Sequence, residues 1–293
     1  MHHDVIVVGG SYAGMAAALQ LLRARRTVLV IDAGLRRNRF AEESHGFLGQ
    51  DGADPADVAC GARDQLMRYP TLTWVDGLAE QAGGERDAFT VGTADGAAHA
   101  GRRLLFATGV ADDLPPVEGL VERWGRSVFH CPYCHGYELD QGRIGVIATG
   151  PMSLHQALLI PEWGTVTLLA NGAIRPDAAQ HAELAARGVA IEEEPIAGLE
   201  GHADVRLADG RLLPFAGLFT ATRTAPATPI AERLGCALEE TPFGSQIRTD
   251  ASKETSVPGA FACGDAARAP HSVSLAVGDG AWAGAQLHRS LVF

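Results

Sequence analysis

The stretch that most constrains the fold is an apolar run that stops abruptly at a glycine. Residues 4–9 read DVIVVG, the segment Gly9-Gly10-Ser11-Tyr12-Ala13-Gly14 follows, and an Ala/Leu-rich run predicts a helix from Met15 to Leu22. A strand, a tight turn and a helix in this order are the context in which a G-x-G-x-x-G pattern binds a dinucleotide, because backbone amides and a helix N-terminus approach the pyrophosphate. Ser11 stands at the middle glycine position, where it adds a Cβ near the phosphates.

A carboxylate follows at the spacing that such a site requires. The next predicted strand, Thr27–Asp32, ends in an acid, and Asp32 lies 23 residues beyond Gly9 (32 − 9). An acid about 20 residues after the first glycine hydrogen-bonds ribose hydroxyls. The turn and the acid together favour a dinucleotide site over an ordinary strand–helix–strand unit.

The same pattern recurs in the second half of the chain. Residues 143–153, RIGVIATGPMS, again read as a strand, a turn and a helix start, and a further strand, Thr165–Asn171, ends 23 residues beyond Ala148 (171 − 148). Such self-similarity indicates a duplicated nucleotide-binding unit. We therefore predict an α/β protein with two Rossmann-like, three-layer ββα domains.

The second copy has lost most of the residues that hold a nucleotide. Gly150 remains, but Ala148 and Ser153 stand at the other glycine positions, and Asn171 replaces the ribose-binding acid. Arg175 stands alone after the strand, whereas arginines normally clamp a 2′-phosphate. Two interpretations stay open, a working NADPH or NADH site and a retained scaffold that binds its nucleotide poorly or not at all.

Charge and hydropathy narrow the class of partner. The net charge of −11 argues against nucleic acid or an anionic membrane as a partner, because phosphates need concentrated positive charge. No apolar run reaches the roughly 20 residues of a membrane span, and the first strand begins too early to leave room for a signal peptide. Five cysteines are too few for a disulfide framework, so we expect a reducing, cytoplasmic location.

Two cysteines lie two residues apart between the nucleotide-binding patterns, in the segment His130-Cys131-Pro132-Tyr133-Cys134-His135-Gly136. Such a pair can close a small disulfide or stay a dithiol, and in a reducing compartment it is redox-active or metal-binding rather than structural. The C-x-x-C-H pattern also matches c-type haem attachment, which requires export, and zinc would need a second ligand pair. The other cysteines, Cys60, Cys236 and Cys263, are isolated, and we expect them to be small buried packing residues.

Histidines flank the pair on both sides. Imidazole titrates near neutral pH, so His135 or His130 can act as the acid and base for the thiols, with His135 the first choice. The alternative for either histidine is a packing or surface role.

Three further segments have local patterns of interest. Residues 103–109 form a strand that ends in Ala107-Thr108-Gly109, and Phe261-Ala262-Cys263-Gly264-Asp265 places a carboxylate where it can accept hydrogen bonds from a polyol chain. A small-residue helix is predicted from Gly280 to Leu287, with its N-terminus toward an electron-rich ring system. The loop Arg36–Arg39 reads either as backbone lying close to a ligand or as an ordinary basic surface loop.

These motifs, taken in order, resemble the low-molecular-weight thioredoxin reductases and their relatives, the flavin-dependent dithiol oxidases, over nearly the whole chain. The resemblance implies FAD, a homodimer, and an FAD-binding domain made of residues 1–112 and 245–293. An NAD(P)-binding-like domain, residues 113–244, is inserted in it and carries the cysteine pair. The implied cofactor-binding residues are Gly9, Ser11, Ala13, Gly14, Asp32, Ala107, Thr108, Gly109, Gly264 and Asp265.

The resemblance also implies roles for the cysteines, with Cys134 facing the flavin and Cys131 exchanging with the substrate. Two departures from the family pattern matter. His135 stands where thioredoxin reductases carry an acid, and Ala170-Asn171-Gly172 stands where they carry a basic NADPH motif.

Three functions therefore compete. The first is an FAD enzyme that reduces a protein disulfide such as thioredoxin with NAD(P)H, and the second is an oxidase that takes electrons from a small dithiol and passes them to oxygen. The third is a flavin-binding redox sensor or scaffold without turnover.

Overall fold

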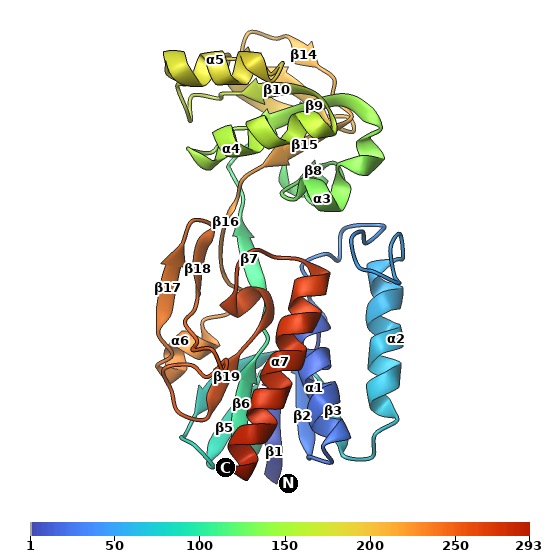
Figure 1. Ribbon diagram of the computed structural model, residues 1–293, viewed down its shortest axis with the longest axis vertical. Helices are drawn as coiled ribbons and strands as arrows, with labels where there is room; N and C mark the ends of the chain where they lie inside the picture. Colours follow the sequence, from blue (N-terminus) through green and yellow to red (C-terminus); the bar gives the residue numbers. More distant parts are fainter. Residues whose placement is uncertain (1) are drawn as a thin grey trace. The chain divides into compact units, whose positions relative to one another are not determined.

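The computed structural model describes residues 2–293, which form two compact units. Unit 1 contains residues 2–39, Phe47–Asp112 and Thr224–Phe293, and unit 2 contains Phe40–Gly46 and Asp113–Arg223. The predicted α/β architecture, with one unit inserted in the other, is confirmed (Figure 1).

Unit 1 is built on a seven-stranded sheet in the order β3-β2-β1-β6-β5-β4, with β19 paired to β6. Strands β1, β2, β3, β6 and β19 run parallel, whereas β4 and β5 form an antiparallel extension. The strands are β1 His2–Val8, β2 Val28–Asp32, β3 Leu72–Asp76, β4 Ala79–Gly83, β5 Phe89–Thr93, β6 Ala98–Phe106 and β19 Ala260–Ala262.

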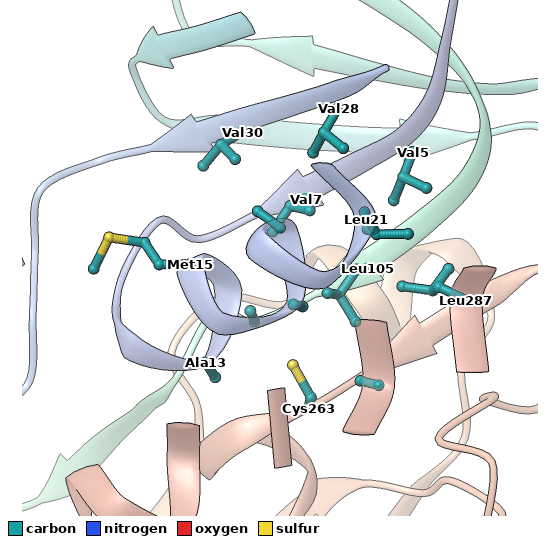
Figure 2. Packing of buried hydrophobic residues seen from close by; sticks show 14 of the residues in the cluster. Val5, Val7, Ala13, Met15, Leu21, Val28, Val30, Leu105, Cys263 and Leu287 are labelled. Atoms are coloured by element: carbon teal, nitrogen blue, oxygen red, sulfur yellow. The ribbon is translucent and has the colours of Figure 1, made fainter. Parts of the chain in front are cut away.

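Both faces of this sheet are covered, which explains why its central strands are continuously apolar. Along β1, Val5 and Val7 point into one core cluster, and Ile6 and Val8 point into the other. Figure 2 shows Val5 and Val7, with Val28 and Val30 of β2, facing the helix that carries Met15 and Leu21. The central strands of the sheet are thus held between two apolar layers.

The helices of unit 1 are α1 Tyr12–Arg23, α2 Pro55–Met67, α6 Ile230–Leu234 and α7 Val273–Val292. Asp54 caps α2 by accepting from the Ala56 amide at 2.6 Å, as its position before Pro55 predicts. Cys60 lies on this helix but is exposed, so its expected burial is wrong, because it falls on the solvent face. Cys236 and Cys263 are buried as expected.

Helix α7 begins earlier than the sequence analysis expected. Ser272 caps it through a 3.1 Å hydrogen bond from the Leu275 amide, so Gly280 lies in the middle of the helix and not at its start. A Cβ on Gly280 would overlap the backbone of Ala13 in α1. This glycine therefore permits close packing of α7 on α1, which lie side by side in Figure 1, and does not mark a turn.

The second boundary between the units lies near Thr224, whereas the expected boundary was residue 245. Strand β16 pairs with β18 through Thr224 and Gly244, in a four-stranded sheet of order β17-β18-β16-β7. Ile230 and Ala231 of α6 join the core of unit 1, which draws residues 224–244 into that unit. The four strands are β7 Val110–Asp113, β16 Arg223–Pro226, β17 Leu238–Thr241 and β18 Gly244–Ile247.

Unit 2 contains a five-stranded parallel sheet, β11-β10-β9-β15-β8, and a three-stranded antiparallel sheet, β12-β13-β14. The strands are β8 Val128–Phe129, β9 Gln141–Ile147, β10 Gly164–Leu169, β11 Ala190–Glu192, β12 Ile196–Glu200, β13 Asp204–Leu207, β14 Leu212–Leu213 and β15 Gly217–Thr220. The helices are α3 Pro132–His135, α4 Met152–Leu159 and α5 Ala178–Ala186. The repeat seen in the sequence is therefore a repeat of the fold.

None of the helices within residues 2–293 combines the length and the hydrophobicity that a membrane span requires. Over the same residues, no group of three or more His, Cys, Asp or Glu side chains is arranged to hold a metal ion.

Candidate functional site

The glycine turn of unit 1 lies where three strand ends meet. The Gly9 amide donates to Ile31 of β2 at 2.9 Å, and the Ala107 amide donates to Val8 of β1 at 2.8 Å. The Cys263 amide donates to Phe106 at 3.0 Å, which brings the end of β19 to the same edge. These bonds gather segments from both ends of the chain at the carboxyl edge of a parallel sheet, where open α/β sheets bind ligands.

Asp32 lies directly against the turn. Its Oδ1 accepts from the Gly10 amide at 3.1 Å. A Cβ on Gly10 would lie 2.6 Å from the Trp74 ring and 2.7 Å from the Asp32 Cβ, so the backbone can approach the acid only at a glycine. This contact fixes the carboxylate beside the turn, where it can accept from a ribose hydroxyl.

The residues of this edge fit a dinucleotide. Ser11, the N-cap residue of α1, makes no side-chain capping bond, so the first amides of the helix are not covered by its hydroxyl. Within residues 2–293, the buried Thr108 Oγ1 and Asp265 Oδ1 have no hydrogen-bond partner in the protein. Uncapped amides and orphaned buried oxygens are what a bound pyrophosphate and a polyol chain would satisfy.

The structure thus brings together the predicted cofactor residues. Gly264 lies so close to Ala13 that a Cβ on the glycine would be 2.5 Å from the alanine Cβ. The segment that contains Gly264 and Asp265 therefore lies against the Gly9–Gly14 turn. The full set is Gly9, Ser11, Ala13, Gly14, Asp32, Ala107, Thr108, Gly109, Gly264 and Asp265, all of unit 1. Their roles in binding remain a prediction.

The cysteine pair lies in unit 2, immediately after β8. Cys131 is the N-cap residue of the short helix α3, Cys134 lies within that helix, and both are half-buried. The Cys134 amide donates to the Cys131 carbonyl at 3.2 Å, so a single helical turn holds the two residues. Gly136 follows, and a Cβ there would lie 2.7 Å from the Trp163 ring.

His135 is half-buried and stacks on the ring of Phe129 in β8. Burial, with a smaller contribution from the nearby His45, lowers the pKa of His135 to about 4. His45 in turn lies 3.3 Å from Glu43 and 3.3 Å from Glu138. A neutral imidazole next to Cys134 can accept a proton at neutral pH.

His130 has a different environment. Its carbonyl accepts from the Gln156 side chain at 3.0 Å, and its ring centroid lies 6.1 Å from that of Trp124. The choice between His130 and His135 as acid and base remains a prediction.

The second glycine pattern, in unit 2, is occupied by the protein's own groups. The Thr149 amide donates to Ser153 Oγ at 2.9 Å, and the Thr149 hydroxyl donates to the Ala221 carbonyl at 2.6 Å. Asn171 Oδ1 accepts from the Ile196 amide at 2.8 Å, and Arg175 is exposed. The loop amide and the residue at the ribose position are therefore engaged within the chain, so a nicotinamide nucleotide would have to share or displace these hydrogen bonds.

Four residues that lie beside the predicted sites were not identified as site residues from the sequence. Arg37, Asp112 and His271 surround Asp265 in unit 1, and His45 lies near His135 in unit 2. Arg37 was part of a loop that read equally as a basic surface. Its partners Asp112 and Asp265 lie 75 and 228 positions away, so no local pattern could have revealed the contact.

Comparisons with known proteins agree with this arrangement. The model of a family described as pyridine nucleotide-disulphide oxidoreductase matches residues 3–280. The thioredoxin reductase tcpT of Claviceps purpurea is 33% identical over 315 residues, covering 99% of this chain and 94% of that protein.

Two solved structures share the whole fold. The oxidoreductase from Agrobacterium tumefaciens is 57% identical with a TM-score of 0.98, covering 100% of this chain and 99% of that chain. The protein HlmI is 35% identical with a TM-score of 0.91, covering 99% of this chain and 93% of that chain.

Proposed function

Because the chain belongs to the pyridine nucleotide-disulphide oxidoreductase family, we propose that it interconverts a dithiol and a disulfide through Cys131 and Cys134. It is a thioredoxin reductase-like FAD oxidoreductase, and enzymes of that kind use FAD with NADPH as the electron donor. The observation that carries the proposal is the position of the two cysteines on one turn of α3, with a neutral histidine directly after the second.

The residues that would hold FAD are those gathered at the carboxyl edge of the unit 1 sheet. Amides of the Gly9–Gly14 turn would bind the pyrophosphate, Asp32 the adenosine ribose, and Thr108 and Asp265 the remaining polar groups. When bound, FAD supplies a carrier that takes up and releases two electrons.

The cysteines carry the exchange with the substrate. In the reducing direction the Cys131 thiolate attacks one sulfur of the substrate disulfide, which forms a mixed disulfide and releases the first substrate sulfur as a thiolate that takes up a proton. Cys134 then attacks Cys131, which closes the Cys131–Cys134 disulfide and releases the second thiol. The pair gives up two electrons, and oxidation of a substrate dithiol is the same sequence in reverse.

His135 would move the proton of the neighbouring thiol. Only the thiolate attacks a disulfide, so deprotonation of Cys134 must precede its attack on Cys131. The neutral imidazole of His135 accepts this proton, and His130 is the alternative base.

A second candidate function is the oxidation of a small dithiol with oxygen, without NADPH. The hydrogen bonds of Thr149 and Asn171 within unit 2 favour it, because they engage the groups that a nicotinamide nucleotide would need. In this version the two electrons from the dithiol pass to oxygen, which with two protons leaves as hydrogen peroxide.

An anaerobic absorbance titration separates these functions. Bleaching of the flavin absorbance by NADPH or NADH supports the reductase, whereas bleaching by a dithiol alone, with the colour returning in air, supports the oxidase. If neither reductant bleaches the flavin, the protein is a flavin-binding sensor or scaffold and the proposed chemistry is wrong.

The proposal extends to partners and assembly. The substrate is a thioredoxin-like protein disulfide or a small dithiol, and the working form is a cytoplasmic homodimer. Reduction of insulin through added thioredoxin tests the first substrate class, and sedimentation equilibrium tests the dimer.

A further inference from the structure

Arg37 is a half-buried arginine in the loop that follows β2. Its side chain is 18% exposed and forms a two-pronged contact with Asp112, which is 6% exposed, at the end of β7. The Nε–Oδ2 distance is 2.9 Å and the Nη2–Oδ1 distance is 2.5 Å. A guanidinium held by two parallel bonds to one carboxylate has a fixed orientation.

The third arm of the same guanidinium faces Asp265 and His271. Nη1 lies 3.4 Å from Asp265 Oδ2 and 2.9 Å from His271 Nδ1. Because a guanidinium nitrogen only donates, His271 Nδ1 must accept, and the ring is the neutral tautomer with its proton on Nε2. Arg37 thus contacts Asp112, Asp265 and His271 through one guanidinium and supplies a positive charge to both carboxylates.

The other oxygen of Asp265 has no such partner. Asp265 Oδ1 is buried and makes no hydrogen bond within residues 2–293. A buried carboxylate oxygen is costly to leave unsatisfied. Asp265 therefore has one oxygen, Oδ2, that is held by Arg37, and a second oxygen, Oδ1, that can accept from a ligand hydroxyl.

We propose that Arg37 is a positioning residue of the FAD site, which holds Asp265 turned so that Oδ1 accepts a hydroxyl of the cofactor's polyol chain. Asp112 anchors Arg37, and through these contacts one side chain joins three segments of unit 1, the loop after β2, strand β7, and the turn between β19 and α7. This role holds whichever direction the cysteine chemistry takes.

Loss of Arg37 would remove the guanidinium that Asp112 and Asp265 share. The Asp265 carboxylate would then lose the contact that fixes its orientation, and it could rotate away from the position in which it accepts from the cofactor. We expect Arg37→Met to weaken FAD binding by about 30-fold or more, which corresponds to about 2 kcal/mol.

The test is a double-mutant cycle read out as the FAD dissociation constant of the full chain. Apo-protein is titrated with FAD, and quenching of flavin fluorescence is followed for wild type, Arg37→Met, Asp265→Asn and the double variant. If Arg37 acts through Asp265, adding Arg37→Met to Asp265→Asn changes the constant less than twofold. Arg187→Met, which removes an exposed arginine paired with Glu162, is the matched control and leaves the constant unchanged.

Independent effects of Arg37→Met and Asp265→Asn, or a single Arg37→Met variant that binds FAD like wild type, would overturn the inference. Arg37→Lys keeps the charge but loses the two-pronged contact, and it takes the place of Arg37→Met if that variant does not fold. The same coupling criterion then applies. If wild type itself binds no FAD, the family-based function fails rather than this inference.

Discussion

The imidazole of His135 stacks on the phenyl ring of Phe129, with ring centroids 4.2 Å apart and an angle of 16° between the ring planes. The histidine is half-buried next to Cys134, and this burial, together with His45, lowers its pKa to about 4. A histidine that is neutral at pH 7 cannot supply the positive charge that stabilises a thiolate. A pKa of about 4 also makes it a weak base, so it can hold a thiol proton only transiently. The proposed role of His135 is therefore that of a transient proton acceptor and not of an electrostatic activator.

The lowered pKa predicts how stability depends on pH. The pKa of His135 is about 4 in the folded chain and 6.5 ordinarily, so between these values the unfolded chain binds a proton that the folded chain does not. The stabilising contribution is full above pH 6.5 and is lost as the pH falls toward 4. We expect a loss of roughly 1–3 kcal/mol from this residue.

Urea unfolding at pH 7, 6 and 5 measures this loss. Burial also lowers the pKa values of His3 and His271, so the informative quantity is the difference between wild type and His135→Phe, which keeps an aromatic ring without a proton site. His181→Asn, at an exposed position, is the control. Equal slopes for wild type and His135→Phe would show that His135 does not titrate as stated.

The same substitution tests the catalytic assignment. We expect His135→Phe to slow disulfide exchange by about 100-fold, because general-base catalysis contributes at least that factor, with the FAD content unchanged. His130→Asn should cause a smaller loss. Stopped-flow measurement of the rate of disulfide exchange compares the two variants. If His130→Asn is slower than His135→Phe, His130 and not His135 is the acid and base.

The two glycine turns make a matched pair for alanine substitution. A Cβ at Gly10 would lie 2.6 Å from Trp74, whereas a Cβ at Gly150 would have nothing within 4 Å. We expect Gly10→Ala to destabilise unit 1 by about 1–3 kcal/mol and to lower the bound FAD, and Gly150→Ala to change neither. Thermal unfolding and the ratio of flavin to protein absorbance measure both effects, and similar behaviour of the two variants would contradict the structural reading.

An ion pair between Lys253 and Asp279, which lies inside α7, makes a stability prediction. Lys253 Nζ lies 3.0 Å from Asp279 Oδ2, with side chains 11% and 12% exposed, and the same oxygen accepts from the Gly264 amide at 2.9 Å. Lys253→Met leaves Asp279 buried without its counter-charge, at a cost of about 3–5 kcal/mol. Chemical denaturation checks this, and adding Asp279→Asn to Lys253→Met should restore part of the loss, since no buried charge then remains.

Much of the fold was predictable because its signals are local. β1 and β2 are apolar runs bounded by glycine or an acid, Asp54 and Pro55 mark the start of α2, and the repeat foretold the second sheet. The start of α7 was mispredicted because a glycine inside a helix looks like a glycine in a turn until its neighbour is known. For Gly280 that neighbour is Ala13, far away in the sequence.

The site was predictable only in part for the same reason. Motif residues such as Asp32 are recognised by spacing, but Arg37 gains its meaning from Asp112 and Asp265, which only the fold brings near. The same holds for the second glycine turn. Its groups are hydrogen-bonded within the chain through the carbonyl of Ala221 and the amide of Ile196, and no pattern around Thr149 or Asn171 contains these partners.

The most direct test of the central claim is an anaerobic reductive titration with dithionite, followed by flavin absorbance, of wild type and Cys134→Ser. A flavin and a disulfide that exchange electrons each accept two, so wild type should consume about two equivalents of dithionite per FAD before full reduction, and Cys134→Ser about one. If wild type is fully reduced by one equivalent, with no further uptake by the cysteines, Cys131 and Cys134 do not exchange electrons with the flavin and the account is wrong.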